Sequence, residues 1–446
     1  MALRDRMPGG DKDPAAKLSE SARHKLDELK VKLHHQLVEK IDFEKLEKID
    51  KGRAELEVQR IVENLLDREG TPLNRFERLQ LVREISHEVF GFGPLETLLH
   101  DDAVNDILVN GSHQVFVERQ GKLVLSDVKF RNEDHLRQII DRIVGRVGRR
   151  IDESSPMVDA RLPDGSRVNA IIPPLALNGS SLSIRKFREM PFHADDLVRF
   201  GSWTKEVADV LKLAVGGRFN LIISGGTGTG KTTMLNILSS HISDAERIIT
   251  IEDAAELQLQ QRHVVRLETR PPNVEGKGGV DQRALVKNAL RMRPDRIIIG
   301  EVRGAEALDM LQAMNTGHEG SITTVHANTP RDAIGRLETM ALYSETNLTH
   351  DSIMRQIASA IHIILQLKRF SDGVRRLLCL SEVIGLKGDV VQIQDIVSFN
   401  QTGVTDKGEV VGEFIKHPCQ PEFLRQLRVR GLIPKSMNLK EWGFKD

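Results

Sequence analysis

A glycine-rich run near the middle of the chain has the composition and spacing of a phosphate-binding loop. Its residues are Gly225, Gly226, Thr227, Gly228, Thr229, Gly230, Lys231, Thr232 and Thr233. An apolar run at residues 221–224 precedes it and apolar residues at helical spacing follow it, which is the context that such a loop requires. Glycines let backbone N–H groups curve around phosphates, the helix amino terminus adds positive charge, Lys231 reaches the β and γ phosphates, and the Thr232 hydroxyl ligates Mg²⁺. We therefore predict a site for ATP and Mg²⁺.

Two further apolar runs end in acidic residues. Residues 247–251 lead into Glu252 and Asp253, and residues 296–300 lead into Glu301. In open α/β sheets, ligands bind at the carboxyl ends of the strands, so these carboxylates are expected beside the phosphate loop. We predict that Glu301 is the general base for the attacking water and that Glu252 contributes to the outer shell of the metal. For Asp253, a helix-capping role is an equal alternative.

Two histidines flank the next strand-like run. His318 precedes it and His326 follows it. They could be zinc ligands, but no third ligand lies at a useful spacing. We favour a role for both as sensors of the γ phosphate, and an ordinary core or surface histidine is the alternative for each.

The pattern of apolar runs predicts an α/β fold. After about residue 196, apolar strands alternate with helices, which is typical of a parallel sheet covered on both faces. Between residues 71 and 190, short strand-like runs and one helix from about 133 to 149 predict a smaller α+β domain. We expect a tail and helical extension at residues 1–70, the α+β domain at 71–190, with a linker near 186–196, and an ATPase domain with a C-terminal subregion at 191–446.

The amino-terminal extension contains one clear amphipathic face. Leu26, Leu29, Leu33 and Leu37 recur at spacings of three and four residues, so they share one side of a helix. Packing against the chain's own next helices is favoured over a coiled-coil or membrane-surface role. Residues 1–20 are polar and have the composition of a loose tail.

Composition bounds the classes of partner. The chain has 64 basic and 64 acidic residues among 446, and this balance counts mildly against duplex DNA binding, which usually needs a basic excess. We expect no nucleic-acid partner. No apolar run approaches the roughly 20 residues that span a bilayer, and no signal sequence is recognisable, so we expect a cytoplasmic protein. Cys379 and Cys419 are far apart, and reduced thiols are the expectation.

One segment is locally basic. Between residues 129 and 150 there are seven basic and three acidic residues, and Arg142, Arg146 and Arg149 lie near one helical face. A solvated helix face or a subunit interface is favoured over contact with nucleic acid or lipid headgroups.

Longer motifs carry a family resemblance. GGTGTGKTT, TIEDAAE, RPDRIIIGEVRGAEALDMLQAMNTGHEGS and TTVHANTPRDAIGRLE resemble the secretion ATPase superfamily of type II, type IV pilus and type IV secretion systems. Upstream, GFGPLETLL, VNDILVNG, VFVER, RLPDGSRVNAIIPP and LSIRKF resemble its CpaF branch, the Tad/Flp pilus assembly ATPases, as do DGVRR and LSEVIGL downstream. The resemblance covers roughly residues 75–400.

The resemblance implies a RecA-like P-loop core and a role for each motif. It implies an Asp box at Glu252, a Walker B segment whose catalytic acid is Glu301, and a His box that spans His318 and His326. It also implies arginines from the amino-terminal domain that reach a neighbouring subunit's phosphates. These carry over to Arg161, Arg167 and Arg185, with Arg161 and Arg185 favoured; a plain surface charge is the alternative for each.

The resemblance further implies a homohexamer that acts on an inner-membrane pilus platform and is peripheral to that membrane through its partners. A type IV secretion ATPase that moves substrates, and a nucleotide-binding scaffold without turnover, are the alternatives. The sequence departs from the usual P-loop pattern because no aspartate precedes Glu301 as a Walker B metal ligand, which is why Glu252 is assigned that role. Arg303 is expected to pair with the carboxylates nearby, and the loop at 271–280 is a candidate for gating or interface contact.

Overall fold

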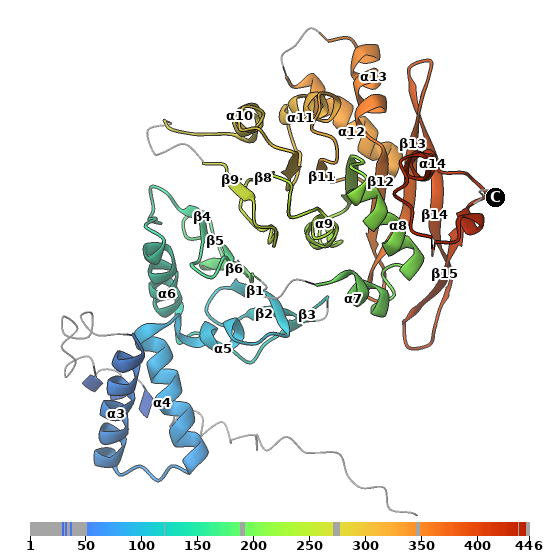
Figure 1. Ribbon diagram of the computed structural model, residues 1–446. Coiled ribbons are helices and arrows are strands. Elements are labelled where there is room, and N and C mark those ends of the chain that lie inside the picture. Colours follow the sequence, from blue (N-terminus) through green and yellow to red (C-terminus); the bar gives the residue numbers. More distant parts are fainter. Residues whose placement is uncertain are drawn as a thin grey trace, which may run out of the picture. The chain divides into compact units, whose positions relative to one another are not determined.

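The computed structural model describes residues 29–30, 32–33, 36–37, 51–119, 121–187, 192–270, 277–344, 348–435 and 437–442. The chain divides into two compact units, unit 1 (Met1–Lys186) and unit 2 (Phe187–Asp446), whose elements are labelled in Figure 1. The predicted tail at residues 1–20 lies outside the described residues, as do residues 188–191 of the predicted linker and residues 271–276 of the predicted loop.

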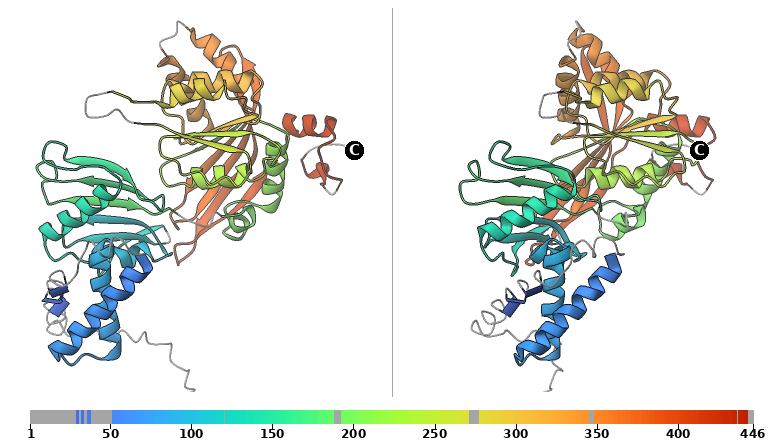
Figure 2. Two further views of the ribbon diagram at one scale, coloured as in Figure 1. Left: turned by 60° about the vertical axis from the view of Figure 1, so that its left-hand side comes forward. Right: turned by 90° about the vertical axis from the view of Figure 1, so that its left-hand side faces the viewer.

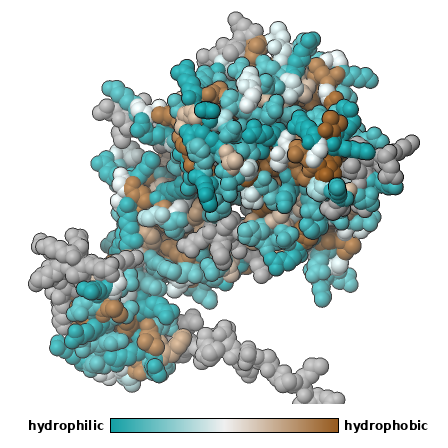
Figure 3. Space-filling view, in the orientation of Figure 1, coloured by the Kyte–Doolittle hydropathy of each residue, from teal (hydrophilic) through white to brown (hydrophobic). Residues whose placement is uncertain are grey.

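Unit 1 begins with a cluster of helices. Helices α3 (Lys51–Glu69) and α4 (Arg75–Phe90) bury apolar side chains together with Leu29, Leu33 and Leu37. The prediction that the leucine face packs on the chain's own next helices is therefore confirmed for these three leucines. The same helices expose Leu56, Phe76 and Leu79, and Figure 3 shows apolar residues on this part of the surface.

Helix α4 has defined ends. At its start the side chain of Asn74 accepts the N–H of Glu77 at 2.9 Å, and the Glu77 carboxylate accepts the N–H of Asn74 at 2.9 Å, which satisfies two otherwise unpaired donors. At its end, Arg142 donates to the carbonyls of Glu88 at 2.6 Å and Gly91 at 2.9 Å, and Arg146 donates to that of Phe90.

These bonds correct the interpretation of the basic segment. Arg142 and Arg146 lie on helix α6 (Glu133–Arg146) and serve the unpaired carbonyls at the end of helix α4, where positive charge is also favourable. The expected solvated face holds for Arg146 and Arg149, which are exposed, whereas Arg142 is half-buried.

The rest of unit 1 is a six-stranded antiparallel sheet in the order β3-β2-β1-β6-β5-β4. Its strands are β1 (Val104–Asn110), β2 (Val115–Arg119), β3 (Lys122–Leu125), β4 (Met157–Arg161), β5 (Arg167–Ile171) and β6 (Ser181–Arg185). Helix α6 lies against this sheet (Figure 2) and contributes Ile139, Ile140 and Ile143 to the core of unit 1. A short 3-10 helix (Gly93–Leu95) and helix α5 (Glu96–Leu99) precede the first strand.

Unit 2 is built on a nine-stranded sheet in the order β15-β14-β13-β12-β7-β11-β10-β8-β9. The six strands from β12 to β9 in this order are parallel, and the last three strands of the chain extend the sheet antiparallel. The strands are β7 (Leu221–Gly225), β8 (Ile248–Glu252), β9 (Val264–Glu268), β10 (Arg296–Ile299), β11 (Ile322–Val325), β12 (Ile363–Arg369), β13 (Arg375–Lys387), β14 (Val390–Val404) and β15 (Val410–Lys416).

Helices cover both faces of this sheet (Figure 2). On one face lie α7 (Ala194–Arg199), α8 (Lys205–Gly216), α9 (Lys231–Ser239) and α14 (Glu422–Val429). On the other lie α10 (Gln282–Ala289), α11 (Glu306–Asn315), α12 (Pro330–Leu342) and α13 (His350–Ala360). Alternation along β7 sends Leu221 and Ile223 into the first core and Ile222 into the second, so the strand is apolar throughout. The chain thus has the α/β fold that its sequence predicts.

Among the described residues, no helix combines the length and apolar character needed to cross a membrane.

Candidate functional site

The glycine-rich run joins strand β7 to helix α9. Gly228 (φ 70°) and Gly230 (φ 92°) adopt left-handed backbone conformations that side chains rarely allow. A Cβ atom on Gly225 would lie 2.5 Å from the hydroxyl of Thr229 and 2.9 Å from the carbonyl oxygen of Leu367. Glycine is therefore required at this turn, where β7 passes against its parallel neighbour β12.

Lys231 lies inside the curve of this loop. Its side chain is buried, and its ammonium donates to the carbonyl oxygens of Gly225 at 3.1 Å and Gly226 at 3.0 Å. Burial lowers the pKa of Lys231, while the negative charge of Glu301 opposes that shift. The loop thus holds a cation where a phosphate group would need one.

His326 connects Lys231 to Glu301. Its Nε2 atom lies 3.2 Å from the Lys231 ammonium and 2.8 Å from Glu301 Oε1. A ring nitrogen either accepts a hydrogen or donates one, so Nε2 can serve Lys231 or Glu301 but not both at once. Burial, followed by the charge of Lys231, lowers the pKa of His326. The three residues come from the ends of three different elements, because β11 ends just before His326 and β10 ends just before Gly300-Glu301.

Arg303 holds the other oxygen of Glu301. Its guanidinium lies 2.6 Å from Glu301 Oε2 and 3.6 Å from Asp253 Oδ2. The prediction that Arg303 pairs with neighbouring carboxylates is confirmed. Glu301 Oε1, in contrast, is buried and has no hydrogen-bond partner of acceptable geometry, although His326 lies close to it.

Glu252 lies beside Glu301 at the end of the adjacent strand. Strands β8 and β10 pair in parallel, and a Cβ atom on Gly300 would lie 3.0 Å from Glu252 Cγ. Glu252 Oε2 accepts the N–H groups of Glu256 at 2.7 Å and Leu257 at 2.9 Å. Burial nevertheless raises the pKa of Glu252 to about 7, because it outweighs these two bonds.

The donor atoms at this edge fit a hydrated magnesium ion. Glu252 Oε1, like Glu301 Oε1, is a buried carboxylate oxygen without a hydrogen-bond partner, and Mg²⁺ prefers one or two carboxylates, phosphate oxygens and retained water molecules. Thr232 lies in the first turn of α9, next to Lys231. Thr232 and Glu252 are therefore the residues that would hold the ion.

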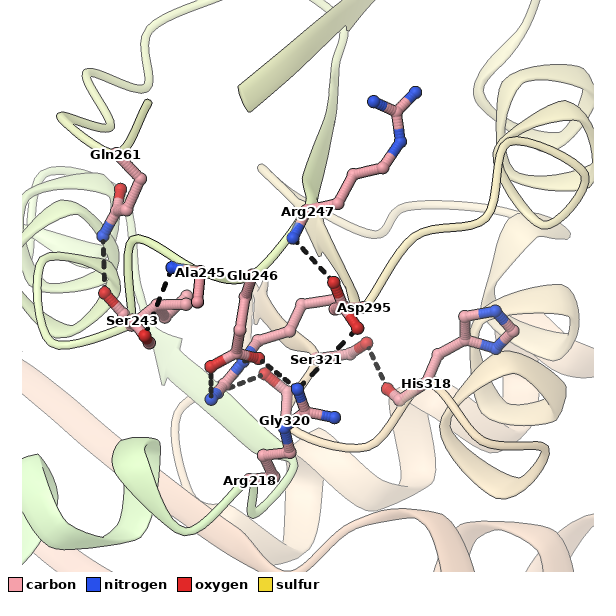
Figure 4. A network of polar contacts seen from close by, with 12 residues as sticks. Arg218, Ser243, Ala245, Glu246, Arg247, Gln261, Asp295, His318, Gly320 and Ser321 are labelled. Carbon is pink, nitrogen blue, oxygen red and sulfur yellow. Dashed lines mark hydrogen bonds and ion pairs between the residues drawn. The ribbon is translucent and has the colours of Figure 1, made fainter. Parts of the chain in front are cut away.

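His318 is not brought to this site. It precedes β11, whereas His326 follows it, so the strand separates the two histidines across the sheet. The carbonyl of His318 accepts the Ser321 hydroxyl at 2.7 Å in the polar network of Figure 4, which lies at the amino ends of the strands. The two histidines are close along the chain, but they lie on either side of strand β11. His318 is therefore at the amino end of this strand and His326 at its carboxyl end.

The three predicted arginines form a row in unit 1. Arg161 is opposite Arg167, and Arg167 is opposite Arg185, on strands β4, β5 and β6. Arg185 in turn faces Asp106, with Nε 3.2 Å from its carboxylate. The Arg161 guanidinium donates to the Gly165 carbonyl at 3.2 Å. The sheet therefore brings these side chains together on one face, since directly opposite residues share a face.

Arg375 lies at the phosphate loop although the sequence did not predict it there. Arg375, at the start of β13, donates from Nε to the Gly228 carbonyl at 2.8 Å. The only signal in the sequence is the arginine pair of the DGVRR motif, and nothing in its spacing indicates a contact with a residue so distant along the chain.

Comparisons with known proteins agree with this arrangement of motifs. Residues 88–404 match the family model described as type II/IV secretion system protein. Over 347 residues the chain is 37% identical to a putative conjugal transfer protein of Mycobacterium tuberculosis, a match that covers 76% of this chain and 97% of that protein. It is 31% identical over 312 residues to the type IV secretion system protein VirB11 of Bartonella henselae, covering 62% and 87% of the two chains. It is also similar to the crystal structure of the VirB11 ATPase from the Brucella suis type IV secretion system, with 28% identity and a TM-score of 0.36, covering 64% and 94%.

Proposed function

Since the chain belongs to the type II/IV secretion system protein family, we propose that it is an ATP-hydrolysing motor subunit with a RecA-like P-loop core in unit 2. The observation that carries the proposal is the chain of contacts from the loop carbonyls through Lys231 and His326 to Glu301. Lys231 and Glu301 lie within one small site, which supports the proposal because hydrolysis of a triphosphate requires a phosphate-binding cation close to a carboxylate base.

The residues divide the reaction between them. The loop amides and Lys231 bind the β and γ phosphates, and Glu301 takes a proton from the water that attacks the γ phosphorus while ADP leaves. Its oxygen Oε1 lies 2.8 Å from His326 Nε2, and Arg303 lies 2.6 Å from its other oxygen, Oε2. Mg²⁺, held by Thr232 and through water by Glu252, would neutralise charge on the β and γ phosphates.

His326 is the sensor of this site. Lys231 donates to the loop carbonyls and lies 3.2 Å from His326. A bound triphosphate gives the ammonium stronger partners, because phosphate oxygens are charged acceptors. Nε2 of His326 is then released to donate to Glu301 or to the γ phosphate. His318 has no sensor role in this site, because it lies at the amino end of strand β11.

The arginine row of unit 1 serves a neighbouring subunit in a homohexamer. A guanidinium delivered to another subunit's nucleotide stabilises the charge of the transition state. Arg161 and Arg185 are favoured over Arg167. Asp106 orients Arg185 from the adjacent strand.

A mixing experiment tests this proposal. Phosphate release per subunit should rise with protein concentration as rings assemble. Lys231→Ala and Arg161→Ala subunits should each be inactive alone and regain activity when mixed, because one supplies the intact loop and the other the arginine. A mixture of Lys231→Ala with Glu301→Gln subunits is the control and should stay inactive. Concentration-independent activity, or no recovery in the first mixture, contradicts the trans arrangement.

The motor powers assembly of a Tad/Flp-type pilus through an inner-membrane platform, and retraction of the pilus is a further candidate role. Support comes from the motifs on both sides of the loop, such as RLPDGSRVNAIIPP and LSEVIGL. The names of the relatives, a conjugal transfer protein and VirB11, favour a second candidate, a type IV secretion ATPase that moves substrates. Deleting the gene and scoring surface pili and substrate transfer separates the two: loss of pili supports the first, and loss of transfer with pili intact supports the second.

A further inference from the structure

The turn between strands β12 and β13 places two arginines against the phosphate loop. Arg375 Nε donates to the Gly228 carbonyl at 2.8 Å. A Cβ atom on Gly230 would lie 3.3 Å from Arg375 Cδ, and one on Gly228 would lie 3.8 Å from a guanidinium nitrogen of Arg369. The two left-handed glycines of the loop are therefore the positions at which these arginines approach it.

This turn is held firmly by its own contacts. The carboxylate of Asp372 binds both terminal nitrogens of Arg376, at 3.1 and 2.8 Å, and accepts the Val410 N–H at 3.1 Å. The Arg376 guanidinium also lies 5.3 Å from the ring centroid of Phe370 and 5.5 Å from that of Phe399. A bidentate pair beside two aromatic rings restrains the backbone at the start of β13. The entropic cost of ordering Arg375 against the loop is therefore small.

Arg375 and Arg376 make contacts on opposite faces of the sheet because they are consecutive in strand β13. Successive side chains of a strand point to opposite faces. Arg376 turns to the buried ring cluster and Asp372, and Arg375 turns to Gly228. One arginine thus builds the turn and the other acts on the loop.

The bond to Gly228 orients an amide of the phosphate loop. A trans peptide is planar, so the carbonyl of Gly228 and the N–H of Thr229 point in opposite directions. Fixing the carbonyl on Arg375 therefore directs the Thr229 N–H away from Arg375. Because loop N–H groups are the ligands of the phosphates, the direction of this amide bears on nucleotide affinity.

We infer that Arg375 is a positioning residue for the nucleoside triphosphate: it sets the phosphate loop in its binding conformation, and Arg369 adds a second positive charge beside the same loop. The inference rests on the proposed nucleotide site and adds to it residues from the carboxyl-terminal part of unit 2. Its effect falls on binding of the triphosphate and leaves the chemical step, which belongs to Glu301, largely unchanged.

The experiment compares four variants of the full chain: Arg375→Ala, Arg375→Lys, Arg369→Ala and Arg355→Ala. Arg355 is the matched control, an arginine of helix α13 that pairs with Asp351 on the surface of the same unit. For each variant, kcat and KM for ATP are measured by phosphate release, and Kd by titration with a fluorescent ATP analogue in the presence of Mg²⁺. Tryptophan fluorescence during urea unfolding checks that each variant is folded.

We expect Arg375→Ala to raise KM and Kd about tenfold or more, since a hydrogen bond from a charged donor is lost, with kcat changed by less than about twofold. Arg375→Lys should recover the affinity only in part, because lysine lacks the planar fork of donors. Arg369→Ala should raise KM by a smaller factor, and Arg355→Ala should match the wild type.

Three outcomes overturn the inference. The first is that Arg375→Ala binds and hydrolyses ATP as the wild type does. The second is a loss of kcat with unchanged KM, and the third is a loss of stability alone. In each case the proposed ATPase function stands and the proposed role of Arg375 is wrong. If the wild-type chain itself binds no nucleotide, the proposed function and the inference fall together.

Discussion

The two edges of the unit 2 sheet both gather charged side chains, but they differ in how completely these are paired. At the amino edge, Glu246 Oε1 lies 2.9 Å from Arg296 Nη2, and Oε2 lies 2.8 Å from Arg296 Nε and 3.0 Å from Arg218 Nη2 (Figure 4). At the carboxyl edge, His326 and Arg303 lie against the two oxygens of Glu301, whereas Glu252 Oε1 is buried and has no hydrogen-bond partner among the described residues. Because a buried carboxylate oxygen without a partner is costly, a ligand bound to Glu252 Oε1 would stabilise this edge.

Within one sheet, the charged residues at the amino edge therefore serve stability, and those at the carboxyl edge serve activity. Arg296 is fully buried and also donates to the Gly320 carbonyl at 3.2 Å, so the chain itself supplies the partners of both the Glu246 carboxylate and the Arg296 guanidinium. Removing a member of a closed network should cost stability. Removing a member of the open site should cost activity and leave stability nearly unchanged. The predictions below follow from this contrast.

The largest expected effect is that of Lys231→Ala at the open edge. We expect kcat/KM for ATP to fall on the order of 10³-fold or more, because the charge that faces the β and γ phosphates is lost. Phosphate release under saturating Mg²⁺ measures this. A variant with more than a tenth of the wild-type rate would show that the loop is not the hydrolytic site.

Glu301→Gln should lower the turnover rate nearly as much as Lys231→Ala does, but it should change the affinity for ATP only slightly. Glutamine cannot take a proton from water, so kcat should fall about 10² to 10⁴-fold, while the Kd for ATP should change by less than about threefold. Single-turnover kinetics and equilibrium titration measure the two quantities. Hydrolysis near the parent rate would remove Glu301 as the base.

Arg296→Met tests the closed edge. It leaves the Glu246 carboxylate without its main partner, and we expect unit 2 to lose about 3 to 5 kcal/mol in its free energy of unfolding, with kcat and KM per folded molecule unchanged. Both tryptophans of the chain, Trp203 and Trp442, lie in unit 2, so their fluorescence during urea unfolding reports on this unit.

The double variant Arg296→Met/Glu246→Leu is the control, because it removes the stranded charge and should regain much of the stability. If Arg296→Met changed KM strongly without a loss of stability, the amino edge would not have the purely structural role assigned to it.

The smallest effect concerns a closed carboxylate in unit 1. Glu88 is buried against His135, with Oε2 3.0 Å from Nε2, and lies 3.6 Å from Lys30. Burial alone raises the pKa of Glu88, but the hydrogen bond from His135 and the nearby positive charges outweigh it and hold the pKa at about 2. The folded pKa is thus below the unfolded value of about 4.5. This carboxylate therefore stabilises unit 1 above pH 4.5 and loses that contribution as the pH falls towards 2.

We accordingly expect Glu88→Gln to destabilise unit 1 at pH 7 by about 3 kcal/mol at most, with a deficit that narrows below pH 4.5. Hydrogen exchange of peptides from helices α4 and α6, read by mass spectrometry at several pH values, measures it. A deficit that is constant with pH would mean that packing, not charge, accounts for the loss.

Much of unit 2 is predictable because its strands are buried on both faces. The apolar runs before Gly225, Glu252 and Glu301 mark strands β7, β8 and β10 without ambiguity, and the rule that ligands bind at strand ends brings their polar neighbours to one edge. The strands of unit 1 are harder to delimit from the sequence, because short antiparallel strands with one exposed face carry a weaker signal.

What the sequence could not supply are contacts that depend on strand order and side-chain direction. His318 and His326 look alike in the sequence, but β11 places them at opposite edges. Arg142 and Arg146 look like a surface patch, yet they bind the terminal carbonyls of a helix far away in the chain. Arg375 reaches Gly228 only because β12, the partner of β13, also pairs with β7.

The most direct test of the account is calorimetric titration of the Glu301→Gln chain with ATP in the presence of Mg²⁺. We predict saturable binding with a Kd in the range of about 1 μM to 1 mM that is typical of enzyme substrates, and no binding under the same conditions by Lys231→Ala. If neither the wild-type nor the Glu301→Gln chain binds ATP, the open carboxyl edge is not a triphosphate site and the assignment of a motor ATPase is contradicted.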